Sequence, residues 1–201
     1  MPVNSPATSQ RGQVRHGSAD EPPPKPGLRS GVKTDQEATG TENDVPSSAD
    51  ATEALIDLIE TRYHAAHRRQ LPELVRLARL VEEVHGGNTA VPRGLTALLE
   101  HMEVVLEGHM QKEERVLFPI MRRYGQARLA QPIAGLLADH DDHAALLREL
   151  ETLTDGFEAP AGACGTWRAL YAGGRELADD LVRHIQIEND LLFPRFVASA
   201  D

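Results

Sequence analysis

One segment of this chain recurs in a form that few folds can accommodate. The sequence HMQKEERVLFP at 109–119 returns without a gap as HIQIENDLLFP at 184–194, 75 residues later. Both copies begin with His-x-x-x-Glu, His109/Glu113 in one and His184/Glu188 in the other. Residues four apart share one face of a helix, with about 5–6 Å between their Cβ atoms. The repeat therefore predicts two similar helices that each present an imidazole and a carboxylate on one face.

These ionisable pairs fall within apolar stripes. Counting by threes and fours around the first copy selects Leu95, Leu98, Met102, Leu106, His109, Glu113, Val116 and Ile120. Around the second copy the stripe contains Leu170, Leu177, Leu181, His184, Glu188 and Leu191. Polar and charged groups in a core are costly unless a partner is buried with them. A metal ion is the simplest partner that several imidazoles and carboxylates can share.

Other histidines lie on apolar stripes at a similar depth. One stripe contains Ile133, Leu136 and His140, with His143 nearby, and another leads through Leu74, Ala78 and Val81 to His85. His64 is at the edge of the face formed by Leu55, Ile56, Ile59 and Tyr63, and His67 is an alternative to it. On one straight helix, His64 and His85 would be about 31 Å apart. Both can serve one centre only if the chain bends near residues 70–72.

The chain divides into a tail and a helical domain. Residues 1–50 are rich in Pro, Gly, Ser and Thr, and we predict that they form a disordered tail. Residues 51–201 are rich in Leu, Val, Ala, Glu and Arg with helical spacing. Proline, glycine and capping residues predict helices over about 51–68, 71–86, 92–123, 130–154 and 163–196. The predicted fold class is all-α, a helical bundle.

Composition excludes several classes of protein. A formal net charge of -10 gives no basic surface for nucleic acid. No run approaches the roughly 20 apolar residues of a membrane span. Residues 1–10 lack the apolar segment of a secretory signal, so we expect a cytoplasmic location. Cys164 is the only cysteine, which excludes an intrachain disulfide and any site held by several thiolates of one chain.

The segments that carry these residues resemble the hemerythrin-like (HHE) di-iron proteins known as repair-of-iron-centres or iron–sulfur cluster repair proteins. The resemblance runs from about Ile56 to Phe196 and rests on YHAAHRRQLPELVRLARLVEEVHGG, HMQKEERVLFP, ADHDDHAALL, ACGTWRALY and HIQIENDLLFPR. It implies a hemerythrin-like four-helix bundle with an extra short helix. It also implies metal ligands at His64, His85, His109, His140 and His184, with Glu113 and Glu188 as bridging carboxylates.

The cofactor implied by the resemblance is a pair of iron ions joined by an oxo or hydroxo bridge. Imidazole and carboxylate ligands suit iron, with manganese as a less favoured alternative, and the absence of thiolates argues against a structural zinc site. Five histidines would divide three and two between the ions, which leaves one ion with an open position for a small molecule.

The function implied is the repair of iron–sulfur clusters damaged by nitrosative or oxidative stress, with damaged iron–sulfur proteins as clients. The alternatives are an NO-reducing or NO-scavenging di-iron enzyme and an O2-binding carrier or sensor. The sequence leaves open whether the protein is an enzyme; as an enzyme it would be a di-iron oxidoreductase acting on NO. We expect NO or O2 as the small ligand, and either a monomer or a dimer is compatible with the sequence.

Two features differ from the family's pattern. Members of the family often carry a small N-terminal domain with a cysteine pair, whereas residues 1–50 contain no cysteine. Val105 lies one turn before His109, where a carboxylate is common in the family, and Asp139 takes a place that is often held by Glu.

Overall fold

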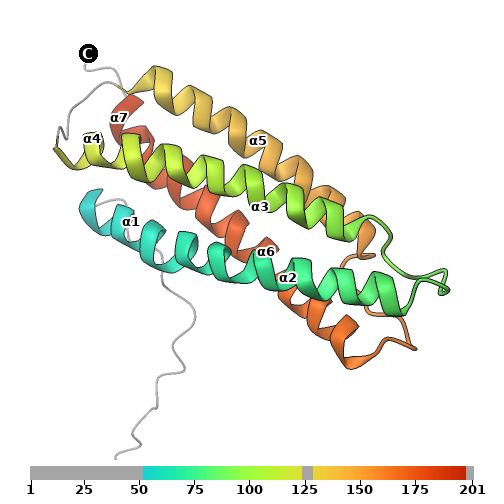
Figure 1. Ribbon diagram of the computed structural model, residues 1–201. Helices are drawn as coiled ribbons and strands as arrows, with labels where there is room; N and C mark the ends of the chain where they lie inside the picture. Colours follow the sequence, from blue (N-terminus) through green and yellow to red (C-terminus); the bar gives the residue numbers. More distant parts are fainter. Residues whose placement is uncertain (1–51, 124–128, 198–201) are drawn as a thin grey trace, which may run out of the picture. The chain divides into compact units, whose positions relative to one another are not determined.

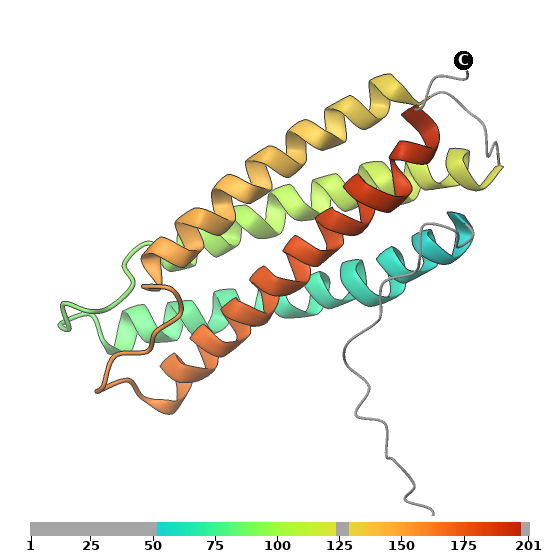
Figure 2. The ribbon, with the colours of Figure 1, turned by 180° about the vertical axis from the view of Figure 1, so that it is seen from behind.

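The computed structural model describes residues 52–123 and 129–197, which form four helical rods (Figures 1 and 2). The first rod contains α1 (Thr52–Leu58), the π-helical turn η1 (Ile59–His64) and α2 (Ala65–Val84). The second contains α3 (Leu95–Lys112), the π-helical turn η2 (Glu113–Leu117) and α4 (Phe118–Arg123). The third is α5 (Ala130–Leu153), and the fourth contains α6 (Gly165–Ile187), the π-helical turn η3 (Glu188–Leu192) and α7 (Pro194–Val197). The predicted all-α bundle is confirmed.

The first rod corrects one expected boundary. The helices predicted over 51–68 and 71–86 are one continuous rod, with Pro72 inside α2. A proline in a helix interior costs about 3 kcal/mol. Beyond it, Leu71, Leu74, Val75, Ala78 and Val81 are all buried, and each large apolar side chain contributes roughly 1.5–3 kcal/mol. Burial of this face therefore outweighs the hydrogen bond that Pro72 removes.

The core consists of two apolar clusters with a polar layer between them. One cluster surrounds Trp167 and includes residues of α2, α3 and α6. The other surrounds Phe118 and Phe193 and includes residues of α1, α4 and α5. Along every rod, the buried histidines lie between residues of one cluster and residues of the other, and Glu113 and Glu188 adjoin the second cluster. The fold thus concentrates its buried polar groups at one level of the bundle.

Three π-helical turns adjoin this polar layer. In each turn an amide donates to the carbonyl five residues earlier: Ala65 to Glu60, Phe118 to Glu113 and Phe193 to Glu188. Two of the turns end two residues before Pro119 and Pro194, whose missing N–H groups interrupt the α-helical ladder. The structure widens the helix just before each of these two prolines. Such turns are rare and often occur at functional sites.

The N-terminal tail and the possibility of a membrane span are two further points of the fold. The predicted disordered tail, 1–50, falls entirely in the undescribed part of the chain. Among the helices that the structure describes, none has the length and apolar character to cross a bilayer.

Candidate metal centre

Six buried side chains from all four rods meet in the polar layer. His64 is the last residue of η1, and His140 lies in the middle of α5. His109 and His184 lie in the last turns of α3 and α6. Glu113 and Glu188 are the first residues of η2 and η3, so each carboxylate stands where the helix widens. The sequence repeat predicted this arrangement of two matched His-x-x-x-Glu faces.

The six side chains form two groups that share both glutamates. One group is His64, His184, Glu113 and Glu188, and the other is His109, His140, Glu113 and Glu188. Within each group, one possible ligand atom of every residue lies within 4.8 Å of the others. The Nε2 atoms are 3.2 Å apart in the pair His64–His184 and 3.1 Å apart in the pair His109–His140. Two positions with two imidazoles each are therefore joined by two carboxylates.

The carboxylates need a positively charged partner. Both oxygens of Glu113 are buried and have no hydrogen-bond partner in the described part of the chain. Burial, together with the nearby Glu188 carboxylate, raises the pKa of Glu113 well above its usual range. Burial also opposes ionisation of Glu188, but His184 and His140 outweigh it and hold the pKa of Glu188 well below its usual range. Cations between the carboxylates would satisfy both, so the residues present fit a metal centre.

Two of the four imidazoles are held in the neutral form that binds metal. Burial lowers the pKa of His64 and of His109 to about 4, against an ordinary value of 6.5. Burial also acts to lower the pKa of His140, but the hydrogen bond with Glu188 raises it. A neutral imidazole offers a lone pair to a metal ion, whereas a protonated one must first lose its proton. At neutral pH, His64 and His109 are thus ready to coordinate.

Outer hydrogen bonds orient three of the four rings. Each donates its Nδ1–H away from the centre: His64 to Glu114 (2.7 Å), His109 to Asp139 (3.2 Å) and His140 to Asn189 (2.9 Å). Arg68 in turn donates to Glu114, and Lys112 donates to Asp139. Such partners fix the tautomer and turn Nε2 inward. Helical periodicity does not point to Glu114 or Asn189, which lie directly after the two glutamates of the centre.

Comparison with known proteins agrees with this geometry. Residues 55–196 match the family described as the hemerythrin HHE cation binding domain. The chain belongs to this family. The match spans all six residues of the centre. Both four-residue groups therefore lie within the matched HHE cation binding domain.

Curated relatives of this HHE domain carry a common name. The chain is 50% identical over 141 residues to the iron-sulfur cluster repair protein YtfE of Edwardsiella ictaluri, covering 70% of this chain and 64% of that protein. It is 44% identical over 144 residues to the protein of the same name from Escherichia coli O157:H7, covering 72% of this chain and 66% of that protein. The match thus spans slightly less than two thirds of these relatives.

His85 is not brought to the centre, which corrects one predicted ligand. It caps the C-terminus of α2, in the part of the HHE domain where α2 meets the start of α6. Its Nε2 lies 3.2 Å from Sγ of Cys164, and its ring centroid is 5.1 Å from that of Trp167. Because the first rod is continuous, the 21 residues after His64 carry His85 about 31 Å along the helix. The bend that could have joined them is absent from this rod.

Two other histidines lie against the centre of the HHE domain. His67 and His143 are buried, with ring centroids 5.4 Å from His184 and 4.8 Å from His109, respectively. From the sequence, His67 was an alternative to His64, and His143 was expected near His140. A second repeat in the sequence could have shown that both histidines belong to this layer. His-x-x-His occurs at 64–67 and again at 140–143. Both rings carry buried nitrogens without a hydrogen-bond partner among the described residues, His67 at Nδ1 and Nε2 and His143 at Nδ1; in the centre itself, His184 Nδ1 is in the same condition.

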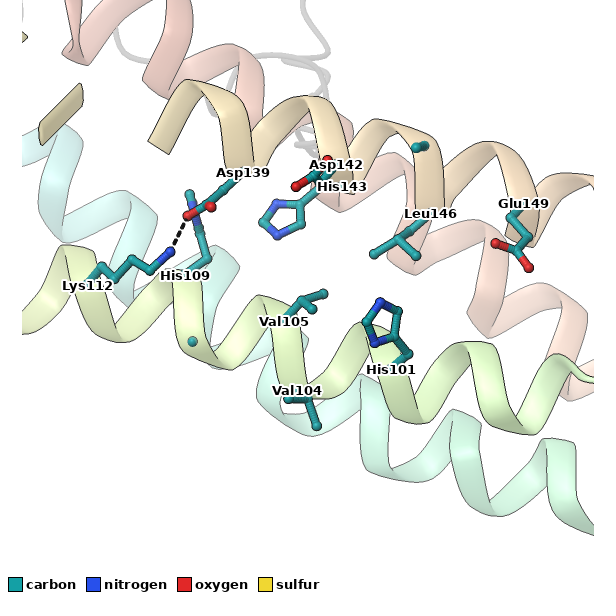
Figure 3. A pocket seen from close by; sticks show the side chains of 12 residues that line it. His101, Val104, Val105, His109, Lys112, Asp139, Asp142, His143, Leu146 and Glu149 are labelled. Carbon is teal, nitrogen blue, oxygen red and sulfur yellow. Dashed lines mark hydrogen bonds and ion pairs between the residues drawn. The ribbon is translucent and has the colours of Figure 1, made fainter. Parts of the chain in front are cut away.

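A pocket of about 580 Å³ between α3 and α5 reaches this layer (Figure 3). We refer to it as the α3–α5 pocket. His109 and His143 are its buried lining residues, whereas His101, Val104 and Glu149 are exposed. A small molecule can therefore approach the histidine pair His109–His140 from solvent through this side of the HHE domain.

Proposed function

We propose that this chain holds two iron ions and acts in the repair of iron–sulfur clusters damaged by nitrosative or oxidative stress. The observation that carries the proposal is the sharing of Glu113 and Glu188 by two histidine pairs. The name of the relatives at 44–50% identity supports the choice of repair as the function. Damaged iron–sulfur proteins are the clients that this function requires.

Four imidazoles and two carboxylates would hold the ions. His64 and His184 serve one position, His109 and His140 serve the other, and Glu113 and Glu188 bridge them. Such nitrogen and oxygen donors suit iron, with manganese as the less favoured occupant. The ligand count differs from the expected three and two histidines, because His85 lies elsewhere. Two imidazoles and the two shared carboxylates would hold each ion, which would leave room at each ion for an oxo or hydroxo group and for a small ligand.

The chain's own residues set the conditions for that chemistry. The bound pair of ions would supply iron to a damaged cluster or bind NO. Glu114, Asp139 and Asn189 hold three imidazoles in a fixed orientation through Nδ1. The two apolar clusters exclude bulk water above and below the centre. The α3–α5 pocket leaves one side accessible.

Reactivation of a damaged enzyme tests repair directly. A purified [4Fe–4S] hydratase is inactivated with NO and then incubated anaerobically with iron-loaded protein. We expect recovery of hydratase activity with the unchanged chain and with the variant His85→Leu, which leaves the centre intact. We expect none with Glu113→Leu, which removes a shared carboxylate. Equal recovery with Glu113→Leu, or no recovery with the unchanged chain, would contradict the proposal.

A second candidate function is an NO-reducing or NO-scavenging enzyme, a di-iron oxidoreductase acting on NO. The α3–α5 pocket favours it, because Val104, Val105 and Leu146 give a small gas an apolar path to His109. Anaerobic titration of the ferrous protein with NO separates the two: N2O formed over several turnovers indicates the enzyme, whereas NO binding without turnover favours repair. A reversible absorption change in air would instead indicate O2 binding by a carrier or sensor.

A further inference from the structure

The α3–α5 pocket ends on a histidine that neither four-residue group uses. His143 is 2% exposed, and its ring stands edge-on to His109 with centroids 4.8 Å apart. Figure 3 shows it beside Asp142 on α5, directed across the pocket toward α3. Its Nδ1 is buried and finds no hydrogen-bond partner in residues 52–123 or 129–197. Because buried polar atoms in native proteins are almost always partnered, this nitrogen indicates a further partner beyond these described residues.

We propose that His143 hydrogen-bonds a small molecule bound to the ion that His109 and His140 hold, and that the α3–α5 pocket is the route of this molecule. The inference rests on the proposed di-iron centre and adds a binding residue to it. A neutral imidazole has one N–H to donate, and no residue that the structure describes engages Nδ1 of His143. The molecule needs one atom with a lone pair for iron and a second atom that accepts a hydrogen bond.

The lining of the pocket restricts this molecule to a small one. Val104, Val105 and Leu146 offer no polar contact, and Gly108 has no side chain. Lys112 is engaged with Asp139, with Nζ 2.7 Å from Oδ2, so it is not a free cation for an incoming anion. Asp142 and Glu149 add negative charge to the lining and disfavour polyanions. The chemical class that remains is a diatomic or triatomic molecule, neutral or with a single negative charge.

The opposite side of the centre offers a matched comparison. His67 also follows a histidine of the centre by three residues, is buried, and lies against the other histidine pair. Its pocket is smaller, about 230 Å³, and Arg68 lines it. Arg68 donates to both Glu107 and Glu114, which fixes the guanidinium at that side. Entry is therefore favoured on the side of His143, and His67 serves as a control of the same chemistry.

Azide binding to the diferric protein tests the assignment. Azide has a single charge and three atoms, and it gives a charge-transfer band on ferric iron that can be titrated. The variants are His143→Leu, His143→Gln, which restores a donor, and His67→Leu. Iron content, circular dichroism and the visible spectrum without azide are measured for each. We expect all variants to retain two irons and the unchanged spectrum.

The expected result is a loss of azide affinity by about tenfold or more in His143→Leu, which is what one hydrogen bond to a charged group contributes. His143→Gln should recover part of the azide affinity, and His67→Leu should change the affinity by less than about twofold.

Unchanged azide affinity in His143→Leu with two irons present would overturn this inference alone. Loss of iron in His143→Leu would also overturn it, since His143 would then be a ligand. Absence of iron from the unchanged chain would overturn the proposed function itself.

Discussion

Glu113 and Glu188 each lie within reach of both histidine pairs, although 75 residues separate them in the chain. His64 Nε2 and His109 Nε2 are both 3.4 Å from the same oxygen of Glu113, Oε2. Glu188 contacts His184 through Oε1 (3.0 Å) and His140 through Oε2 (3.1 Å). The two ion positions therefore depend on the same pair of carboxylates and cannot be lost independently.

Replacement of one shared carboxylate should remove iron and stabilise the metal-free fold. We expect Glu113→Leu to bind less than one iron per chain. Because the buried carboxylate of Glu113 has no hydrogen-bond partner among the described residues, the same change should raise the free energy of unfolding of the metal-free protein by about 1–4 kcal/mol. Metal analysis and urea denaturation measure the two effects. Glu100→Leu, at an exposed position of the same helix, is the control and should change neither by much.

His85 should be dispensable for iron binding. The structure places it against Cys164 and Trp167, whereas His64 lies between Glu113 and His184. We expect His85→Leu to keep two irons per chain and the unchanged visible spectrum. His64→Leu should lose iron under the same purification. Iron loss in His85→Leu, without loss of helical structure, would restore His85 as a ligand and contradict the continuous first rod.

The Cys164 thiol should react at lower pH than an ordinary cysteine. Cys164 is the N-cap of α6, and hydrogen bonds from the Trp167 backbone and from His85 lower its pKa to about 7. The rate of reaction with a small disulfide reagent should therefore be half-maximal near pH 7. His85→Leu removes one of these contacts, so its midpoint should move upward. A midpoint near the usual cysteine value in the unchanged chain would contradict the observed geometry.

The metal-free protein should lose stability as the pH falls below about 6.5. Burial lowers the pKa of His64 and His109 to about 4, and of His67 and His143 to about 3. The unfolded chain therefore binds more protons than the folded chain between these values and 6.5, which favours unfolding. Each histidine should contribute roughly 1 kcal/mol per pH unit in this window. Urea denaturation at pH 7, 6 and 5 measures how the free energy of unfolding changes with pH. His143→Leu should reduce this slope by roughly 1 kcal/mol per pH unit, the contribution of one histidine. A stability that is constant or rises toward pH 5 would contradict the buried, neutral histidines.

Helical periodicity predicted much of the centre. It identified the pairs His109/Glu113 and His184/Glu188, because the two residues of each pair lie on the same face of their helix. The sequence repeat showed that the two faces match. His140 followed from the apolar stripe of its helix. The failure at His85 had a different origin: its stripe is real, since Leu74, Ala78 and Val81 are buried. An apolar stripe shows which face of a helix a residue occupies, but it does not show how far along the helix axis the residue lies. Because the first rod is continuous, His85 lies on the buried face but far from the metal centre.

The π-helical turns explain where the periodic count failed locally. The stripe predicted Val116 in the core, but Val116 is 56% exposed and Leu117 is 2% exposed. A turn with bonds five residues apart adds one residue, so the buried face beyond Glu113 moves from Val116 to Leu117 and Phe118. The second copy shows the same shift, since Leu192 is fully buried and Leu191 is not. Pro119 and Pro194 were the only local signs of these turns.

The metal content and visible spectrum of the protein, purified without added metal, test the central claim most directly. Two shared carboxylates and two histidine pairs predict two iron ions per chain and the near-ultraviolet and visible absorption of a bridged diferric centre. Glu113→Leu, purified in parallel, should give neither. One ion per chain, or zinc alone, would contradict a di-iron centre at Glu113 and Glu188.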